Sequence, residues 1–347
     1  MHRLKYLLVF TLPLTVVVAF EMEGLWTFFP MLIFFCVVPI LELFIPPDRA
    51  NLEKKIAEDE KNKRIYDYIL YATLPIQVGF VGYFLFVMNN TVFGSLEFFG
   101  RIISMGLMCG VIGINVGHEL GHRLNRWEQL VGEMLLLTSL NTHFLPYHNG
   151  GHHKNVATPA DSATARKNEI IFLYWIRSHF GSYVEAWQLE NERLQRENKP
   201  WVSFRNRMIG YSIANVLLLS GIGFFLGIYT LMAFVIAAVI GILLLETVNY
   251  IEHYGLLRNQ RDNGSYEPVR HQHSWNSDHV LGRTILFNLS RHSDHHFSGS
   301  KKYQVLKSHA NSPQMPTGYP GMMLMALAQP IWFRIMNERL KKYQPET

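Results

Sequence analysis

The stretch that decides the fold class covers residues 229–250 and reads YTLMAFVIAAVIGILLLETVNY. It carries no charged side chain before Glu246, near its end. A helix needs about 20 consecutive, mostly apolar residues to cross the core of a lipid bilayer. The stretch therefore predicts a transmembrane helix.

Further apolar blocks of similar length precede it, at residues 4–20, 25–45, 68–88, 96–117 and 208–226. The chain of 347 residues is 49% hydrophobic and only 17% charged, whereas about a quarter of the residues in a typical soluble domain are charged. The first block could be a signal peptide, but VVAFEMEG offers no small-x-small cleavage site, which favours a retained helix. We expect an all-α membrane protein in which residues 1–347 form a single domain with six transmembrane helices.

The positive charges predict the orientation in the membrane. Residues 21–24, residues 89–95 and the connection near Gly227 contain no Lys or Arg, whereas residues 118–207 and 251–347 are rich in both. Lys and Arg are enriched in cytoplasmic loops. We therefore expect an integral protein of a bacterial inner membrane with both termini and a histidine-rich cap, formed by these two long segments, in the cytoplasm. These cytoplasmic segments account for the net charge of +5, which therefore does not indicate a nucleic acid partner.

The histidines gather on this same side. Of 16 in the chain, all except His2 fall within the two long segments. His118 and His122 are spaced i, i+4, which places both on one helical face, and two further groups show similar spacing. His253 stands alone at the end of the last apolar block. The candidate metal ligands are His118, His122, His148, His152, His153, His253, His292, His295 and His296.

Nine imidazoles exceed the needs of one tetrahedral zinc ion, and they suit two metal ions with open positions. Imidazole suits zinc, copper, iron and nickel alike. Zinc has no redox chemistry and would favour hydrolysis. Because a site at the inner ends of apolar helices is accessible to a hydrocarbon in the bilayer, we favour a redox metal and dioxygen.

The segment HELGH at residues 118–122 also fits the H-E-x-x-H pattern of zinc metalloproteases. An intramembrane metalloprotease is therefore an alternative, although it leaves seven of the candidate histidines unexplained. The two cysteines, Cys36 and Cys109, cannot build a Cys₄ cluster. The sequence shows neither a G-x-G-x-x-G fingerprint nor a haem-attachment motif, so electrons for oxygen chemistry must come from a separate carrier.

Five stretches resemble the alkane monooxygenase family of integral-membrane non-haem di-iron hydroxylases, which is related to xylene monooxygenases and membrane fatty-acid desaturases. They are HELGHR, HNGGHHKNVATPAD, NYIEHYGLLR, HSWNSDHVLGRTILFNLSRHSDHHFSGSKKYQ and PTGYPGM. The likeness covers most of the chain and is densest between residues 115 and 322. The pattern NYxEHYG separates this branch from the desaturases.

The resemblance implies that the nine histidines bind two iron ions, divided unevenly as four ligands and five. It also implies O₂-dependent terminal hydroxylation of medium-chain n-alkanes to 1-alcohols, with electrons from a rubredoxin and its reductase. A xylene-type methyl hydroxylase or a fatty-acyl desaturase or hydroxylase is the alternative within the superfamily. Three departures from the family pattern, Tyr147, Ser162 and Arg123, leave the substrate range open.

Other polar residues are candidates for supporting roles. Metal-bound imidazoles usually donate their second N–H to a carboxylate, a carbonyl or water. The candidates for orienting the ligands are Glu119, Asp161, Glu246, Asn249, Glu252, His273 and Asp294; for Glu119 an ion pair with Arg123 is an equal alternative. His143 and His179 are expected to be structural. The candidates for docking the electron donor are Arg123, Arg126, Lys154, Arg291, Lys301 and Lys302.

The bilayer segments should enclose a channel for the hydrocarbon chain. Small residues on a helix leave room for such a channel, or they allow two helices to pack closely. The candidates are Gly79, Gly82, Gly106 and Gly113, and the sequence does not decide between the two roles.

Overall fold

A computed structural model describes residues 3–344 of the chain. The described residues form helices joined by loops; they contain no strand, only two isolated bridges. Five helices among the described residues are long and apolar enough to cross a membrane, which confirms the predicted all-α membrane class. These helices are Leu4–Glu21, Gly24–Phe44, Arg64–Asn89, Leu96–Gly121 and Arg207–His253.

The first two of these helices are irregular. Leu4–Glu21 consists of a 3₁₀ segment, η1 (Leu4–Phe10), followed by α1 (Thr11–Glu21). Gly24–Phe44 passes through η2 (Gly24–Phe28), α2 (Phe29–Leu32), the π-helical turn η3 (Ile33–Val37) and α3 (Val38–Phe44). Pro30 and Pro39 lie in it, and because proline has no backbone N–H, the regular α-helical ladder is interrupted.

The next two helices are α5 (Arg64–Asn89) and the run α6 (Leu96–Met108), η4 (Cys109–Ile114) and α7 (Asn115–Gly121). The run ends four residues beyond the predicted limit at Gly117, so His118 lies inside the helix. Most of its residues are buried, whereas fewer than half are buried in each of the other four. Phe86 and Phe224 are 69% and 84% exposed, as expected for side chains that face lipid.

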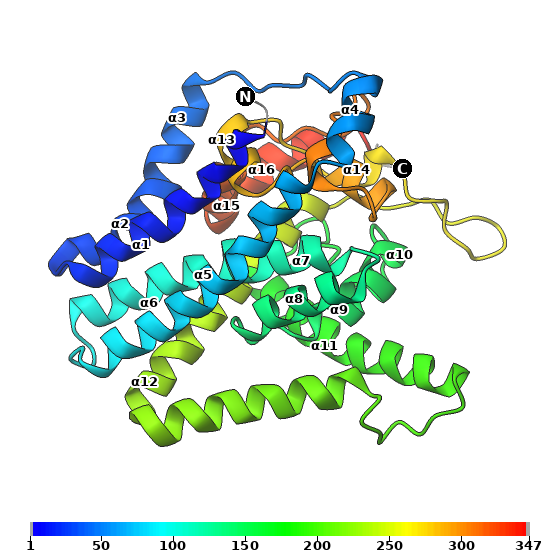
Figure 1. Cartoon of the computed structure of the whole chain (residues 1–347). Coiled ribbons are helices and arrows are strands. Elements are labelled where there is room, and N and C mark those ends of the chain that lie inside the picture. The colour runs from blue at the N-terminus through cyan, green and yellow to red at the C-terminus, as the bar shows by residue number, and fades with distance from the viewer. Residues whose placement is uncertain (1–2, 345–347) are drawn as a thin grey trace. The chain divides into compact units, whose positions relative to one another are not determined.

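The predicted spans 208–226 and 229–250 are the two arms of α12 (Arg207–His253). Gly227 interrupts this helix with φ 81° and ψ 173°. A positive φ is readily adopted only by glycine, and the two arms diverge at this corner in Figure 1. Whether they cross the membrane separately, as the predicted count of six requires, stays a prediction.

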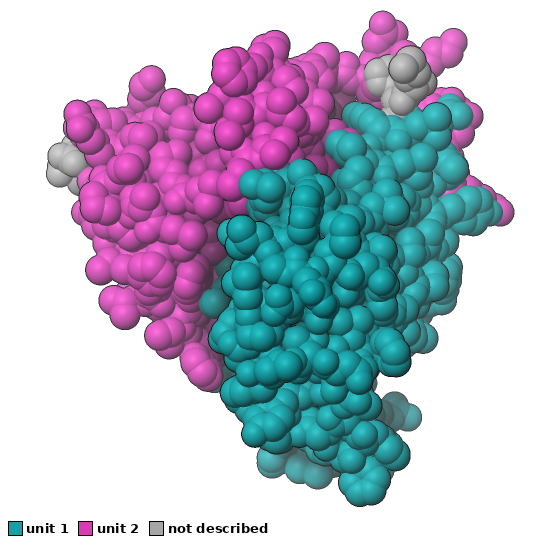
Figure 2. Space-filling view, turned by 90° about the vertical axis from the view of Figure 1, so that its left-hand side faces the viewer, with its two compact units in different colours: residues 1–34, 65–147, 183–245 teal, residues 35–64, 148–182, 246–347 magenta. Residues whose placement is uncertain are grey.

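The chain divides into two compact units, each assembled from three separate segments (Figure 2). Unit 1 comprises residues 1–34, 65–147 and 183–245, and unit 2 comprises residues 35–64, 148–182 and 246–347. The single domain therefore stays a prediction.

The remaining elements are α4 (Lys54–Lys61), α8 (Arg126–Leu137), α9 (Phe144–Tyr147), η5 (His148–His152), α10 (His153–Asn155), α11 (Ile171–Arg196), η6 (His271–His273), α13 (Val280–Ile285), α14 (His292–Phe297), η7 (Tyr303–Val305), α15 (Tyr319–Leu327) and α16 (Gln329–Leu340).

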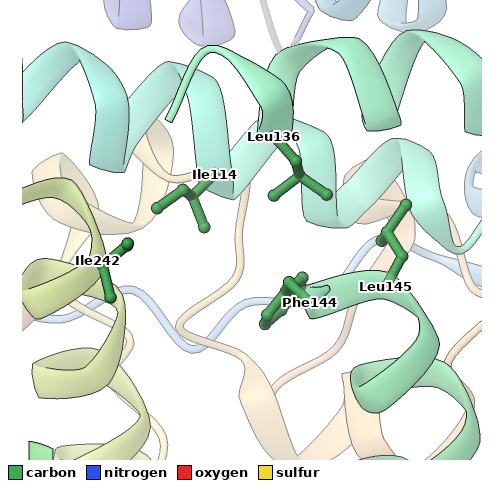
Figure 3. Close-up of a cluster of buried hydrophobic side chains, with 5 residues drawn as sticks. All are labelled: Ile114, Leu136, Phe144, Leu145 and Ile242. Atoms are coloured by element: carbon green, nitrogen blue, oxygen red, sulfur yellow. The ribbon is translucent and has the colours of Figure 1, made fainter. Parts of the chain in front are cut away.

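Unit 1 contains an apolar cluster that reaches its histidines, since Phe144 of the cluster contacts the ring of His118. Figure 3 shows side chains from η4, α8, α9 and α12 that meet in one buried cluster: Ile114, Leu136, Phe144, Leu145 and Ile242. The helices α7 and α8 approach closely because glycines face each other. A Cβ on Gly132 would lie 2.8 Å from the carbonyl oxygen of Gly117. This close packing fixes the helix that carries His118.

Candidate metal centre

Unit 1 contributes one pair of candidate ligands. His118 lies in the last turn of α7 and His122 is the residue that ends it. The Nε2 atoms of the two imidazoles are 3.0 Å apart, as the i, i+4 spacing predicts. The ring of Phe144, from the apolar cluster, lies 5.6 Å from the ring of His118.

Unit 2 brings together a triad of candidate ligands: His148, His153 and His295. The Nε2 atom of His153 lies 3.0 Å from that of His148 and 3.2 Å from that of His295. The turn η5 is π-helical, and a π-helical turn connects residues five apart in the chain. It therefore accounts for the convergence of His148 with His153, which α-helical spacing would not bring together.

A quartet of candidate ligands lies beside this triad in unit 2: His152, His253, His292 and His296. All four are buried, and one ring nitrogen from each lies within 4.8 Å of the others. His253 is the last residue of α12, and its Nε2 lies 3.1 Å from Nε2 of His292 on α14. The rings of His153 and His296 stack at 4.5 Å, so the triad and the quartet are neighbours.

The chemistry of the quartet fits a bound metal ion. Both ring nitrogens of His296 are buried, and neither has a hydrogen-bond partner in the described part of the chain. A buried polar atom without a partner is costly, and coordination to a metal would satisfy it. Because the converging donors are all imidazole nitrogens, they suit iron, zinc, copper or nickel rather than magnesium or calcium.

Asp161 holds the imidazole of His152. Its Oδ2 lies 2.9 Å from Nδ1 of His152 and accepts a hydrogen bond of 2.6 Å from the hydroxyl of Thr164. Its Oδ1 accepts a further hydrogen bond from the N–H of Ala163. Burial by itself raises the pKa of Asp161, but the adjacent His152 and these hydrogen bonds hold it well below its usual range. The Asp161 carboxylate is therefore ionised and accepts a hydrogen bond from the His152 imidazole.

Glu252 lies beside the imidazole of His292, and burial raises the pKa of its carboxyl group well above the ordinary value. Its Oε1 lies 3.1 Å from Nδ1 of His292 and accepts a hydrogen bond of 2.6 Å from the hydroxyl of Tyr319. Burial, together with the neighbouring carboxylate, raises the pKa of Tyr319 well above its ordinary value, so the phenol remains a donor. Sequence reasoning assigned no role to Tyr319, although the resembling stretch PTGYPGM contains it.

Other candidates for orienting the ligands have different partners. Glu119 pairs with Arg123 at 3.1 Å, the alternative that the sequence left open. Glu246 lies 3.9 Å from Nδ1 of His179, which is not one of the nine. His273 contacts Glu267 and the N–H of Arg270.

Asn249 and Asp294 are both buried. Asp294 bonds to His309 and Lys301 rather than to a candidate ligand. His143, expected to be structural, packs its ring 5.3 Å from that of Tyr183.

The candidates for donor docking fall into two groups. Arg123 and Arg291 are buried; Arg123 pairs with Asp67 and Glu119, and Arg291 donates to backbone carbonyls. A docked protein could not contact either guanidinium group without displacing these partners. Lys154 is exposed, Lys301 and Lys302 are partly exposed, and Arg126 is 62% exposed although it pairs with Glu133.

Comparison with known proteins identifies the family. The family model described as fatty acid desaturase matches residues 95–324. The chain is 35% identical to alkane 1-monooxygenase 1 of Alcanivorax borkumensis over 92% of this chain and 79% of the relative. It is 35% identical to alkane 1-monooxygenase 2 of Pseudomonas aeruginosa over 92% of this chain and 85% of the relative.

A more distant relative is the hydroxylase component of xylene/toluene monooxygenase from Pseudomonas putida. It is 27% identical over 97% of this chain and 88% of the relative. The alkane monooxygenase relatives cover the histidine motifs as well as the apolar helices, which leaves the metalloprotease alternative without support. The protein belongs to the alkane 1-monooxygenases of the fatty acid desaturase family, and it is a monooxygenase with a histidine-rich metal centre.

Proposed function

We propose that this protein hydroxylates the terminal carbon of medium-chain n-alkanes, using O₂ and a di-iron centre held by nine histidines. The observation that carries the proposal is the convergence of the triad and the quartet in unit 2. The quartet supplies four ligands to one iron. The triad supplies ligands to the other iron, and His118 and His122 are the remaining two of the nine proposed ligands.

The two irons would supply the activation of O₂ and the oxidation of the C–H bond. The protein orients the ligands. Asp161 binds Nδ1 of His152, which fixes the tautomer of that imidazole and leaves its Nε2 as the proposed ligand atom. Glu252 lies 3.1 Å from Nδ1 of His292. Tyr319 holds the Glu252 carboxylate in place through its hydrogen bond.

The apolar cluster of unit 1 supports a hydrocarbon substrate. Phe144 contacts the ring of His118 on one side and packs into the cluster with Ile242 on the other. An alkane offers no hydrogen bonds, so burial of apolar surface must bind it. Ile242→Phe should shorten the longest alkane that is hydroxylated, while exposed Ile236→Phe should not; an unchanged product profile would show that the cluster does not bind the chain.

The electron donor is proposed to be a rubredoxin that docks in the cytoplasm. The described residues hold only two cysteines, both free, so they cannot build a Cys₄ iron site. Lys154 follows the candidate ligand His153 directly and is exposed. Together with Arg126, Lys301 and Lys302, it forms the part of the predicted docking set that solvent can reach.

The orientation with both termini and the metal site in the cytoplasm of the inner membrane also belongs to the proposal. Reporter fusions after Asn90 and at Gly227 should lie outside the cytoplasm, and fusions after Glu60 and His179 inside it. A periplasmic signal after His179 would place the metal centre on the wrong side of the membrane for a cytoplasmic donor.

The test of the function combines metal analysis with product identification. His253→Ala should lose iron and octane hydroxylation together, because it removes one ligand of the quartet. His143→Ala, which removes a buried imidazole outside the quartet and triad, should keep both. If His253→Ala retains the iron and the activity of the unaltered protein, the ligand assignment fails. A strong preference for the methyl groups of xylene over octane would favour the xylene-type alternative.

A further inference from the structure

A cavity of about 430 Å³ lies in unit 2 and is lined by none of the nine proposed iron ligands. Small-molecule sites measure about 300–1,000 Å³, so the cavity is large enough for a ligand. Its walls come from the segment between α10 and α11, from α11 itself, from the residues after α12, and from the end of α16. The charged lining residues are Asp161, Arg166, Lys167, Arg177 and Lys341. Four cations and one carboxylate favour a negatively charged ligand.

The carboxylate of Asp161 is committed to other partners. Its side chain is fully buried, and its oxygens bind His152, the hydroxyl of Thr164 and the N–H of Ala163. The other polar lining residues are neutral: Thr158, Thr164, Asn337 and Gln344. The cations therefore determine the charge that a ligand meets in the cavity.

Three of these cations lie at the surface. Arg166, Lys167 and Lys341 are all exposed. The guanidinium group of Arg166 forms no hydrogen bond or ion pair with residues 3–344, where its hydrogen bonds are made by backbone atoms. Lys341 pairs with Glu338, which is also exposed, and such a pair contributes little stability. Arg166 can therefore contact an anion without losing another partner.

The fourth cation, Arg177, connects the cavity with an apolar surface. An ion pair with Glu169 holds its guanidinium group in place. Residues three and four positions away on a helix are neighbours on its surface, and for Arg177 these include Leu173 and Phe180, which are 62% and 66% exposed. They belong to a strip of exposed apolar side chains, the α11 face, which consists of Phe172, Leu173, Ile176 and Phe180.

A basic cavity beside an exposed apolar strip matches the two parts of a phospholipid. Guanidinium and ammonium groups bind phosphate, and a strip of exposed apolar side chains on an otherwise polar helix is typical of a helix that contacts lipid. Basic pockets of membrane proteins bind the head groups of anionic lipids. A free phosphate ion would occupy the cavity but leave the α11 face uncovered.

We propose that this cavity binds the phosphate head group of an anionic phospholipid, whose acyl chains cover the α11 face. Arg166 and Lys167 contact the phosphate, and Arg177 marks the edge where the head group ends and the acyl chains begin. The site depends on the membrane location of the protein, but it does not depend on which metal the histidines bind or which hydrocarbon is oxidised.

The test uses the full-length, iron-loaded protein in a neutral detergent, titrated with phosphatidylglycerol and followed by native mass spectrometry. One phosphatidylglycerol should bind each chain more tightly than phosphatidylcholine with the same acyl chains does. Arg166→Gln combined with Lys167→Gln should weaken it about 25-fold, because each cation near an anionic lipid contributes a factor of about five. Lys54→Gln combined with Lys55→Gln is the control, since it removes two exposed lysines of α4 outside the cavity and should leave the affinity unchanged.

A second comparison separates the lipid from a soluble anion. An excess of inorganic phosphate should not displace phosphatidylglycerol, because phosphate cannot cover the α11 face. Phe180→Ser should weaken the lipid about tenfold, whereas Phe225→Ser, at an exposed position of α12, should not.

Iron content and melting temperature check the folding of each variant, and the comparison of the two lipids needs only the unaltered protein. Phosphatidylcholine bound as tightly as phosphatidylglycerol, equal losses in the two double variants, equal effects of the two Phe substitutions, or displacement of the lipid by inorganic phosphate would overturn the proposal.

Discussion

Replacing Asp161 by Asn tests how the protein supports its metal centre. The substitution keeps the size of the side chain and removes its charge. The carboxylate accepts three hydrogen bonds, from His152 Nδ1, from Thr164 Oγ1 and from the N–H of Ala163. The amide of Asn has one acceptor oxygen. If that oxygen keeps the hydrogen bond from the N–H of Ala163, the NH₂ group of the Asn side chain faces the N–H of the His152 imidazole. The imidazole then loses the acceptor that orients it.

The size of the effect follows from these contacts. A hydrogen bond to a charged group contributes about 1.5–3 kcal/mol, and loss of a residue that orients a metal ligand typically lowers metal affinity about 10–100-fold. These two ranges agree, since each factor of ten corresponds to about 1.4 kcal/mol. We therefore expect Asp161→Asn to bind iron 10–100-fold more weakly, with a matching loss of alkane hydroxylation at limiting iron.

The assay is the loss of iron to a competing chelator, with circular dichroism as the check on folding. Thr164→Val is the matched control, because it removes another contact to the same oxygen and leaves the contact with His152 intact. It should change iron affinity by less than about threefold. Iron affinity in folded Asp161→Asn equal to that of the unaltered protein would refute the reasoning, as would an equal loss in both variants.

Three further predictions concern stability and electron transfer. Burial raises the pKa of Glu190, but hydrogen bonds from Arg193 and Arg207 lower it to about 2. The stabilisation from the ionised carboxylate is therefore present above pH 4.5 and lost as pH falls toward 2. In thermal unfolding, Glu190→Gln should cost about 1–2 kcal/mol at pH 7, after allowance for solvent screening of the arginines, and almost nothing near pH 2. A cost that does not change with pH would contradict this. Gly106→Ala places a Cβ 2.5 Å from a side-chain carbon of the facing helix and should lower the stability by about 1–3 kcal/mol. In Gly79→Ala the new Cβ meets no atom within 4 Å, so the melting temperature should stay unchanged or rise. Equal effects of the two substitutions would rule out close packing at Gly106. Lys154→Glu should slow rubredoxin-driven turnover and flatten its salt dependence without changing peroxide-driven turnover, and an unaltered donor-driven rate would exclude Lys154 from the docking surface.

The helices and the gathering of histidines could be predicted because both signals are local in the sequence. Long apolar blocks identify the membrane helices, and i, i+4 spacing predicts that His118 and His122 meet, which their 3.0 Å separation confirms. The break at Gly227 was predictable as a connection between apolar blocks, but its positive φ was not.

The rest depends on contacts between distant segments. The π-helical turn that joins His148 to His153 leaves no periodic pattern. Tyr319 binds Glu252 from 67 residues away, and no spacing rule connects two such positions. Sequence distance also misleads for Asp294, which is next to His295 in the chain but bonds to His309 and Lys301 rather than to a candidate ligand.

The glycines show a similar limit. Gly106 and Gly79 were equal candidates for a channel, yet only Gly106 faces a neighbouring helix, at the side chain of Ile240. Helical position alone does not reveal which face of a membrane helix meets protein and which meets lipid.

The most direct test of the central claim is the iron content of purified protein that converts octane to 1-octanol. The proposed centre predicts about two iron ions per chain, because nine imidazoles exceed what one metal ion can coordinate. The hydroxylation rate should rise in proportion to bound iron. An active protein with no iron and one tightly bound zinc ion would contradict the account.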